Sequence, residues 1–334
     1  MSPIAPSPVP LVVIPCLNEA AHIARVTKQM SNAVRPYGGR VVVADGGSTD
    51  GSRAVVREIA RRDPRVHFLD NPARIQSAGI NAAVAAHGAG HSHLIRVDAH
   101  CAYPDGFIPA LLVDAEATGA SAVVVGMIAA GEGVIQRINA ATQNARIGNG
   151  GSKHRAQGRG EWVDHGHHAL IRLDAFHAVG GYDASFAHNE DAELDARLTR
   201  AGHGIWLTAR TAITYYPRTD ARSLLDQYFR YGRGRARNLL KHRALPNRRQ
   251  WVVISVAPTV ALVAASSLVP LLALPAFLWM AAALAGGVSV AVSERAPVML
   301  LSGGVAMLMH VAWSVGFWTQ LVSAPAGATR GVPA

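Results

Sequence analysis

Three clusters of polar side chains each follow directly after a short apolar segment of the sequence. The clusters are residues 15–19 (PCLNE), 45–51 (DGGSTDG) and 98–100 (DAH). Gly46 and Gly47 allow a ligand to approach the backbone closely, and the polar residues after them can cap a helix. In an extended segment Asp98 and His100 lie on one face of the chain. The clusters therefore predict a ligand-binding site.

The segments before these clusters alternate with segments of helical character. Apolar, β-branched runs predict strands at residues 9–14, 40–44, 66–69, 94–97 and 122–125. Helices are expected between them, at residues 20–34, 51–62, 77–86 and 106–118. This order predicts an α/β fold with a mostly parallel, doubly wound sheet, in which ligands bind at the carboxyl ends of the strands. The three polar clusters should therefore converge on one edge of the sheet.

Half of the 334 residues are apolar, which excludes a disordered chain. Residues 251–292 contain no Asp, Glu, Lys or Arg, and they are long enough for two membrane-spanning helices with a turn near Pro270 and Pro275. A third apolar segment runs from about Pro297 to Val322. This composition predicts about three transmembrane helices in an all-α region.

The formal net charge of +10 comes largely from one segment. Residues 230–250 hold eight Arg or Lys side chains and no acid. A basic patch beside an apolar region favours a membrane surface over a nucleic acid as partner. Short basic loops stay in the cytoplasm, and the first residues do not have the pattern of a signal peptide. The expected divisions are a cytoplasmic domain (1–229), a basic juxtamembrane segment (230–250), a multi-pass transmembrane region (251–322) and a tail (323–334).

Motifs across residues 9–240 resemble those of glycosyltransferase family 2, which has the GT-A fold. They are PCLNE (15–19), DGGSTDG (45–51), NPARIQSAGIN (71–81), LIRVDAH (94–100), WVDHGHHAL (162–170), GGYDASFAHNEDAEL (180–194) and QYFRYGRGRAR (227–237). Within the family, the chain most resembles the succinoglycan-type glucosyltransferases of bacterial exopolysaccharide biosynthesis. The resemblance implies a metal-dependent, inverting hexosyltransferase of the inner membrane. Such an enzyme moves a sugar, glucose in that subgroup, from a UDP-sugar to a lipid-linked, undecaprenyl-type saccharide.

The resemblance places the nucleotide of the donor at the first two clusters. The residues that it implies there are Pro15, Asn18, Glu19, Asp45 and Ser48. Asp45 would accept the N3–H of uracil, which suits a carboxylate because it is an acceptor only. Arg74 and Gln76 are expected to cover the base or the diphosphate, or to make hydrogen bonds between loops.

The cation of the diphosphate is expected at Asp98 and His100. Many GT-A enzymes carry D-x-D at this place, so the histidine departs from the commonest pattern. Imidazole suits Mn²⁺ better than Mg²⁺, and the identity of the ion stays open between the two. His100 could instead donate a hydrogen bond to phosphate or sugar. One of His165, His167 and His168 could complete the metal shell or contact the sugar.

Asp191 is expected to be the general base. Acids at the start of a helix are ordinarily caps, but the resemblance places the base of the family at the second residue of this Glu190-Asp191 pair. An inverting transfer needs a carboxylate that takes the proton of the acceptor hydroxyl. Glu190 would bind hydroxyl groups beside it. Alternatives of lower rank for the base are Asp183, Glu193 and Asp195.

Gln227 and Arg230 belong to a segment similar to the Q-x-x-R-W motif of the family, with Tyr231 in place of Trp. The guanidinium of Arg230 is expected to steady the departing diphosphate. Processive polymerases pair this motif with a translocation channel. About three spans are too few for such a channel, so a single transfer is expected.

Two other functions fit the same sequence. A polyprenyl-phosphate glycosyltransferase would share the fold and the base, and would differ in its acceptor. A non-catalytic membrane protein that senses a nucleotide would bind UDP without transferring sugar.

Overall fold

A computed structural model describes residues 8–156 and 159–323. The chain divides into two compact units. The first comprises residues 1–128 and 156–215, and the second comprises residues 129–155 and 216–334. A segment from the middle of the chain thus belongs with the C-terminal helices.

The first unit is built on one mixed sheet, whose strands within the described residues follow the order β3-β2-β1-β4-β8-β6-β9-β5, with β7 added to β9. The strands are β1 (Pro10–Cys16), β2 (Arg40–Asp45), β3 (Val66–Asp70), β4 (His93–Arg96), β5 (Cys101–Ala102), β6 (Ala122–Ala129), β7 (Glu161–Val163), β8 (His167–Arg172) and β9 (Ile205–Tyr215). Neighbours from β3 to β4 are parallel, and β8 lies antiparallel between β4 and β6. All five strands expected from the sequence are present.

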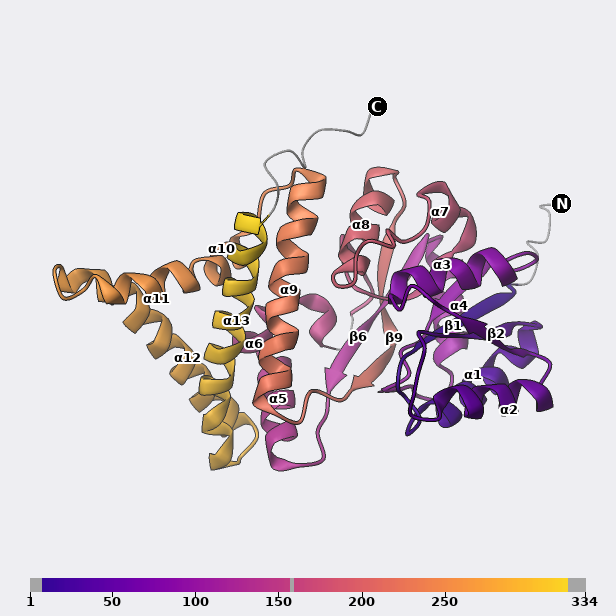
Figure 1. The fold of residues 1–334 in the computed structure, drawn as a ribbon, viewed down its shortest axis with the longest axis horizontal. Helices are drawn as coiled ribbons and strands as arrows, with labels where there is room; N and C mark the ends of the chain where they lie inside the picture. The colour runs from indigo at the N-terminus through magenta and orange to yellow at the C-terminus, as the bar shows by residue number, and fades with distance from the viewer. Residues whose placement is uncertain (1–7, 157–158, 324–334) are drawn as a thin grey trace. The chain divides into compact units, whose positions relative to one another are not determined.

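Helices cover both faces of the parallel half of this sheet (Figure 1). They are α1 (Ile23–Val34), α2 (Ser52–Arg62), α3 (Gln76–His87) and α4 (Phe107–Thr118), and the unit also holds α7 (Leu173–Ala178) and α8 (Glu190–Arg200). The core includes Leu11, Val42 and Leu94 from the parallel strands and Ile171 from β8, all of them buried. Strands buried on both faces read as continuous apolar runs, which is why the sequence pattern locates them.

The second unit is helical. Its helices are α5 (Val134–Asn144), α6 (Arg146–Asn149), α9 (Ala221–His242), α10 (Arg248–Ile254), α11 (Val256–Ala264), α12 (Leu274–Ser293) and α13 (Ser302–Ser323). α9 and α13 lie side by side (Figure 1). Glycines allow this close approach, because a Cβ atom at Gly232 would stand 1.9 Å from the Trp313 carbonyl oxygen.

The inserted segment 129–155 packs against the apolar helices within this unit. Ile138 of α5 forms a buried cluster with Val290 and Met299. His310 of α13 donates from Nε2 to the carbonyl oxygen of Ile147 (2.8 Å) and accepts at Nδ1 from the Trp279 indole (3.3 Å). His310 therefore has a structural role in helix contacts.

Two stretches in the described part of the chain are long and apolar enough to cross a membrane, by length and composition. They are Pro270–Ser293 and Pro297–Ser323. The sequence pattern predicts about three such helices, but residues from Trp251 onward form the short helices α10 and α11, of seven and nine residues. At 1.5 Å per residue these are about 11 and 14 Å long, against about 30 Å for a bilayer core. The first expected span is therefore not one spanning helix.

Pro258 explains the break between α10 and α11. A proline has no N–H to donate to the carbonyl four residues earlier, here that of Ile254. The Ile254 oxygen accepts instead from the Ser314 hydroxyl (2.8 Å) and the Trp318 indole (2.9 Å). Residues of α13 thus satisfy the carbonyl that the proline leaves free. Hydropathy alone does not reveal this break.

Candidate active site

The loops after β1 and β2 are bound to each other, as their positions in the sequence predict. The Asn18 backbone N–H donates to the Ser48 hydroxyl (2.8 Å), and the side-chain oxygen of Asn18 accepts from the Thr49 N–H (2.8 Å). The Glu19 N–H donates to the Ser52 hydroxyl (2.9 Å). Asn18 has a positive φ of 58°, a conformation that asparagine tolerates better than most residues. These bonds place the first two polar clusters together at the edge of the sheet.

Asp45 is buried at the end of β2 with one carboxylate oxygen satisfied and one not. Its Oδ1 accepts from the backbone N–H groups of Gly47 (2.9 Å) and Ser48 (3.0 Å). Its Oδ2 is buried and has no hydrogen-bond partner among the residues that the structure describes. An unsatisfied buried carboxylate oxygen is costly. This oxygen can accept a hydrogen bond from an N–H group of a ligand.

Arg74 and Gln76 lie on the same side of the site. Gly47 has a φ of 87°, and a Cβ atom there would stand 3.5 Å from the Arg74 guanidinium. Arg74 therefore lies over the loop that follows β2. The Gln76 side-chain amide donates to Asp98 Oδ1 (3.2 Å). The Gln76 hydrogen bond joins the start of α3 to the loop after β4.

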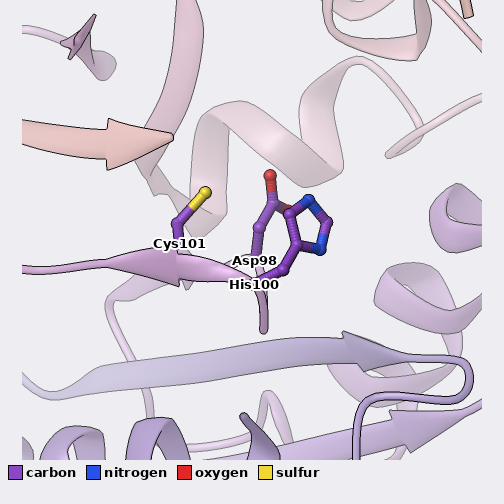
Figure 2. Close-up of side chains that lie close together, drawn as sticks. All are labelled: Asp98, His100 and Cys101. Atoms are coloured by element: carbon purple, nitrogen blue, oxygen red, sulfur yellow. The ribbon is translucent and has the colours of Figure 1, made fainter. Parts of the chain in front are cut away.

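Asp98, His100 and Cys101 form a group whose possible ligand atoms all lie within 4.8 Å of one another (Figure 2). Burial raises the pKa of the Cys101 thiol well above its usual value, and the Asp98 carboxylate adds to this effect. A neutral thiol is a poor metal ligand, because the thiolate is the form that binds. The carboxylate of Asp98 and the imidazole of His100 are the chemically suitable pair. Within the same site, His100 Nδ1 lies 3.0 Å from the Glu19 carboxylate.

Arg96, the last residue of β4, joins three carboxylates. Its Nε lies 3.3 Å from Asp98 Oδ1, and its Nη1 lies 3.4 Å from the Glu190 carboxylate and donates to Asp191 Oδ1. Burial lowers the pKa of Arg96, but the surrounding carboxylates outweigh it and hold that pKa well above its usual value. Nothing in the motifs predicts this role. The available signal is a single arginine within the otherwise apolar strand predicted at residues 94–97.

The charges of this cluster suit a divalent cation. Three carboxylates surround one guanidinium, so the group carries two negative charges when all are ionised. Burial raises the pKa of Asp98, yet Arg96 and the neighbouring histidines hold it well below the usual value. Asp98 is therefore ionised at neutral pH, as a metal ligand must be. The donor set and the charge fit a divalent cation at Asp98 and His100.

Glu190 and Asp191 begin α8, and their environments differ. Asp191 Oδ1 accepts from Arg96 and from the Tyr182 hydroxyl (3.0 Å). Burial and the adjacent Asp191 carboxylate raise the pKa of Glu190 to about 7. Through Arg96, the pair is connected to Asp98. Among the alternatives, Glu193 is buried in an ion pair with Arg197, and Asp183 binds the Ser185 N–H and hydroxyl.

The three histidines divide into two groups. His168 and His165 both bind the buried carboxylate of Asp195, at 2.5 Å and 2.6 Å. Burial raises the pKa of Asp195, but His168 and His165 outweigh it and hold that pKa well below its usual value. His167 instead lies 3.6 Å from Asp98 and 3.8 Å from Asp191. His167 is therefore the histidine of this cluster that faces the candidate site.

Gln227 and Arg230 belong to α9, which is part of the second unit. The Gln227 amide donates to the Tyr231 hydroxyl (2.9 Å) one turn later. Pro15 lies within β1 and precedes the loop that carries Asn18. Glu19 and Ser48, the other residues expected at the nucleotide, form hydrogen bonds between the loops after β1 and β2.

Comparison with known proteins identifies the class of this fold and site. Residues 11–180 match the model of glycosyl transferase family 2. The chain is 53% identical over 313 residues to the succinoglycan biosynthesis protein ExoA of Rhizobium meliloti (strain 1021), covering 93% of this chain and 94% of that protein. The chain belongs to glycosyltransferase family 2, and it is therefore a transferase of the EC 2.4 class.

A solved structure supports the fold. The mannosyltransferase PcManGT from Pyrobaculum calidifontis, in complex with GDP-Man and Mn²⁺, superposes with a TM-score of 0.58. The match covers 95% of this chain and 88% of that chain at 17% identity. This likeness confirms the GT-A fold expected from the sequence.

Proposed function

We propose that this chain transfers a sugar, glucose by its relationship to the succinoglycan protein, from a UDP-sugar to a lipid-linked saccharide in exopolysaccharide biosynthesis. The observation that carries the proposal is the cluster of Asp98, Glu190 and Asp191 around Arg96. It puts a candidate cation ligand and two candidate proton acceptors at one edge of the sheet. A transferase needs both functions within one site.

The donor nucleotide is assigned to the loops after β1 and β2. The unpaired Oδ2 of Asp45 is suited to a ring N–H of the base. Uracil offers such a group at N3, and a guanine would offer its own N–H donors. The relative with a solved structure binds GDP-Man, so the base must be tested directly.

In the proposed reaction, Asp191 takes the proton of the acceptor hydroxyl. The hydroxyl oxygen forms a bond to the anomeric carbon as the bond to the diphosphate breaks, which inverts that carbon. Arg96 and Tyr182 hold Asp191 Oδ1, so Oδ2 is assigned to the proton. A divalent cation at Asp98 and His100, Mn²⁺ or Mg²⁺, would offset the charge of the departing diphosphate. Arg230 is proposed to steady the same group.

Membrane association is assigned to Pro270–Ser293 and Pro297–Ser323, with the basic residues 230–249 on the cytoplasmic surface of the bacterial inner membrane. The short helices α10 and α11 would lie at the interface.

The test uses membranes that contain the full chain. They are incubated with radiolabelled UDP-glucose, UDP-galactose and GDP-mannose, each with extracted lipid-linked saccharide or with polyprenyl phosphate alone. The proposal expects label from UDP-glucose in the lipid-linked saccharide. Label on polyprenyl phosphate alone would support the alternative acceptor, and nucleotide binding without transfer would support a sensor. The Asp191→Asn variant serves as the matched inactive control.

A further inference from the structure

The apolar helices α12 and α13 both contact a short, non-spanning segment of the same unit. His310 is the midpoint of the apolar stretch Pro297–Ser323, and its Nε2 donates to the Ile147 carbonyl oxygen (2.8 Å). A Cβ atom at Gly286, inside the stretch Pro270–Ser293, would stand 2.8 Å from Ile147 Cγ1. Ile147 belongs to α6, a helix of four residues. The interior of both apolar stretches is therefore in contact with α6.

The chain around α6 is unsuited to the interior of a bilayer. Arg146, the first residue of α6, is exposed, and so are Gly150 and Gly151 after its end. The carbonyl oxygens of these two glycines accept from the exposed guanidinium of Arg249, at 3.4 and 2.7 Å. Irregular chain and charged side chains are tolerated at membrane depth only where protein or a water-filled cavity surrounds them. A crossing of α13 would carry this exposed segment into the hydrocarbon.

α9 covers a further side of α13. A Cβ atom at Gly316 would stand 2.0 Å from the Phe229 carbonyl oxygen, and Arg233 Nε donates to the Gln320 side chain (3.3 Å). The part of α9 that follows Phe229 carries five basic side chains: Arg230, Arg233, Arg235, Arg237 and Lys241. A helix with this charge stays at the membrane surface, because charged side chains are expensive in hydrocarbon. Since α13 packs against α9, it must stay at the surface as well.

An exposed apolar surface lies on residues 256–293, which comprise α11, α12 and the chain between them and are named here the apolar arm. Within the most apolar part of each stretch, 22% is buried in Pro270–Ser293 and 39% in Pro297–Ser323. α11 and α12 leave α13 and meet at a turn away from it (Figure 1). Large apolar side chains exposed on the arm include Leu262, Leu268, Leu271, Phe277, Leu278 and Leu284. An exposed apolar surface of this kind marks a contact with lipid or protein.

We propose that the apolar arm lies within one leaflet, parallel to the membrane surface, and that neither apolar stretch crosses the bilayer. Lipid is favoured over a second protein as the occupant, because Arg243, Arg248 and Arg249 are exposed in the segment before the arm. Basic side chains at such a place attract anionic headgroups. An interfacial helix buries its apolar face about 5–10 Å into the boundary between headgroups and acyl chains, which leaves α6 and α9 at the surface.

α12 cannot cross alone under this arrangement. It is joined to α13 by the short segment 294–301, and the two helices share the contact with α6. A crossing of α12 would therefore move α13, α6 and α9 to the far side of the membrane. This inference rests on the proposed membrane association, and it goes beyond it by fixing how the apolar helices meet the lipid.

The first test labels single cysteines from either side of the membrane. Ser267→Cys, Ser293→Cys and Ser323→Cys place a thiol at an exposed position before, between and at the end of the two stretches. Cys16 and Cys101 are buried, so the unsubstituted full-length protein gives the background. A membrane-impermeant maleimide is added to spheroplasts, which present the periplasmic face, and to inverted vesicles, which present the cytoplasmic face.

The inference expects no label in spheroplasts at any of the three positions and clear label at Ser293→Cys in inverted vesicles. A crossing α12 would put residues 267 and 293 on opposite sides, and a crossing α13 would do the same for residues 293 and 323. Label from the periplasmic face at any position therefore overturns the inference. Lack of label at Ser293→Cys in both preparations overturns it too, because the charged turn after α12 would then not face water.

The second test asks what covers the arm. Spin labels at Leu271→Cys, Leu278→Cys and Leu284→Cys are measured in full-length protein in vesicles of phosphatidylethanolamine and phosphatidylglycerol, with oxygen and a water-soluble nickel complex as relaxing agents. All three labels should meet oxygen at depths of at most about 10 Å. Arg61→Cys, at an exposed position of α2, should meet the nickel complex instead. A depth of about 15 Å, the middle of a bilayer core, refutes the proposal, and so do labels that neither agent reaches, since a second protein then covers the arm.

The failure of this inference can be told apart from a failure of the proposed function. Sugar transfer by a protein that is labelled from the periplasmic face would leave the function standing without this topology. A protein with no periplasmic label and no transfer from any donor would leave the topology standing without the function.

Discussion

Arg96 and Asp191 join the end of β4 to the first turn of α8, although they lie 95 residues apart in the sequence. Both side chains are largely buried, and the guanidinium also contacts Asp98 and Glu190. The guanidinium of Arg96 thus holds both the proposed base, Asp191, and the proposed metal ligand, Asp98. The geometry of the site therefore depends on one arginine.

Replacing this arginine should destabilise the protein strongly. Arg96→Leu leaves three largely buried carboxylates without their counter-charge, and removal of one partner from a buried ion pair costs about 3–5 kcal/mol. The free energy of unfolding should fall by about that amount, as measured by denaturant unfolding of the solubilised protein. Arg61→Leu removes an exposed arginine paired with Glu58 and serves as the control. Equal stability of the two variants would contradict the role of Arg96.

The sequence predicts the positions of the parallel strands and the meeting of their loops. Val41–Ala44 and Leu94–Ile95 are buried on both faces, and such strands leave a local apolar pattern. The loop residues Asn18 and Ser48 then meet because parallel strands end on one edge. The local apolar pattern, together with the rule that parallel strands end on one edge, is therefore enough to predict where the loops after β1 and β2 meet.

The contacts of Arg96 and His167 cannot be predicted in this way. They depend on β8 lying antiparallel beside β4 and on the placement of α8, which are tertiary relationships. In the apolar region, composition suggests a helix from Trp251, and the break at Pro258 follows from the proline itself. The partners of the freed Ile254 carbonyl, Ser314 and Trp318 of α13, are tertiary contacts. Periodicity holds no information on such distant partners.

The raised pKa of Glu190 predicts a pH-dependent stability. Burial and Asp191 raise this pKa from 4.5 to about 7 in the folded protein. Between these values the folded state holds a proton that the unfolded chain has released. The contribution to stability is therefore full below pH 4.5 and is lost as the pH rises through about 7.

Glu190→Gln should remove this dependence, because glutamine resembles the protonated carboxyl group. We expect the melting temperature of the variant, minus that of the wild type, to increase as the pH rises from 5 to 8. Both melting temperatures are measured in the presence of EDTA. Glu116→Gln changes an exposed glutamate and should follow the wild type. A constant difference between wild type and Glu190→Gln across this range would show that the pKa is not raised.

Metal removal should abolish sugar transfer. The proposed cation offsets the charge of the departing diphosphate, and Asp98 with His100 is assigned to hold it. Excess EDTA should stop turnover, and Mn²⁺ should restore it at least as well as Mg²⁺. His100→Asp should keep activity and shift the preference toward Mg²⁺, which favours oxygen ligands. Full activity in EDTA would refute the metal requirement.

Asp191→Asn should separate catalysis from helix capping. Asparagine keeps the shape of the side chain and its ability to cap a helix, but it cannot take the proton of the acceptor. Since a general base contributes about 10²- to 10⁴-fold in rate, sugar transfer should fall by about that factor. The affinity for the UDP-sugar should stay within a few-fold, whereas Asp98→Asn should weaken metal-dependent donor binding.

A capping role for Asp191 would give the opposite pattern. The variant would melt at a lower temperature, while turnover per folded molecule would stay near that of the wild type. Kinetics and a melting curve on one preparation of Asp191→Asn therefore decide between the two roles.

Arg96 complicates the comparison, because its bond to Asp191 Oδ1 weakens when the charge is removed. Turnover must accordingly be scaled to the folded fraction. If the scaled turnover is unchanged, the base must be sought at Glu190, whose pKa of about 7 suits a base at neutral pH, or at Asp183.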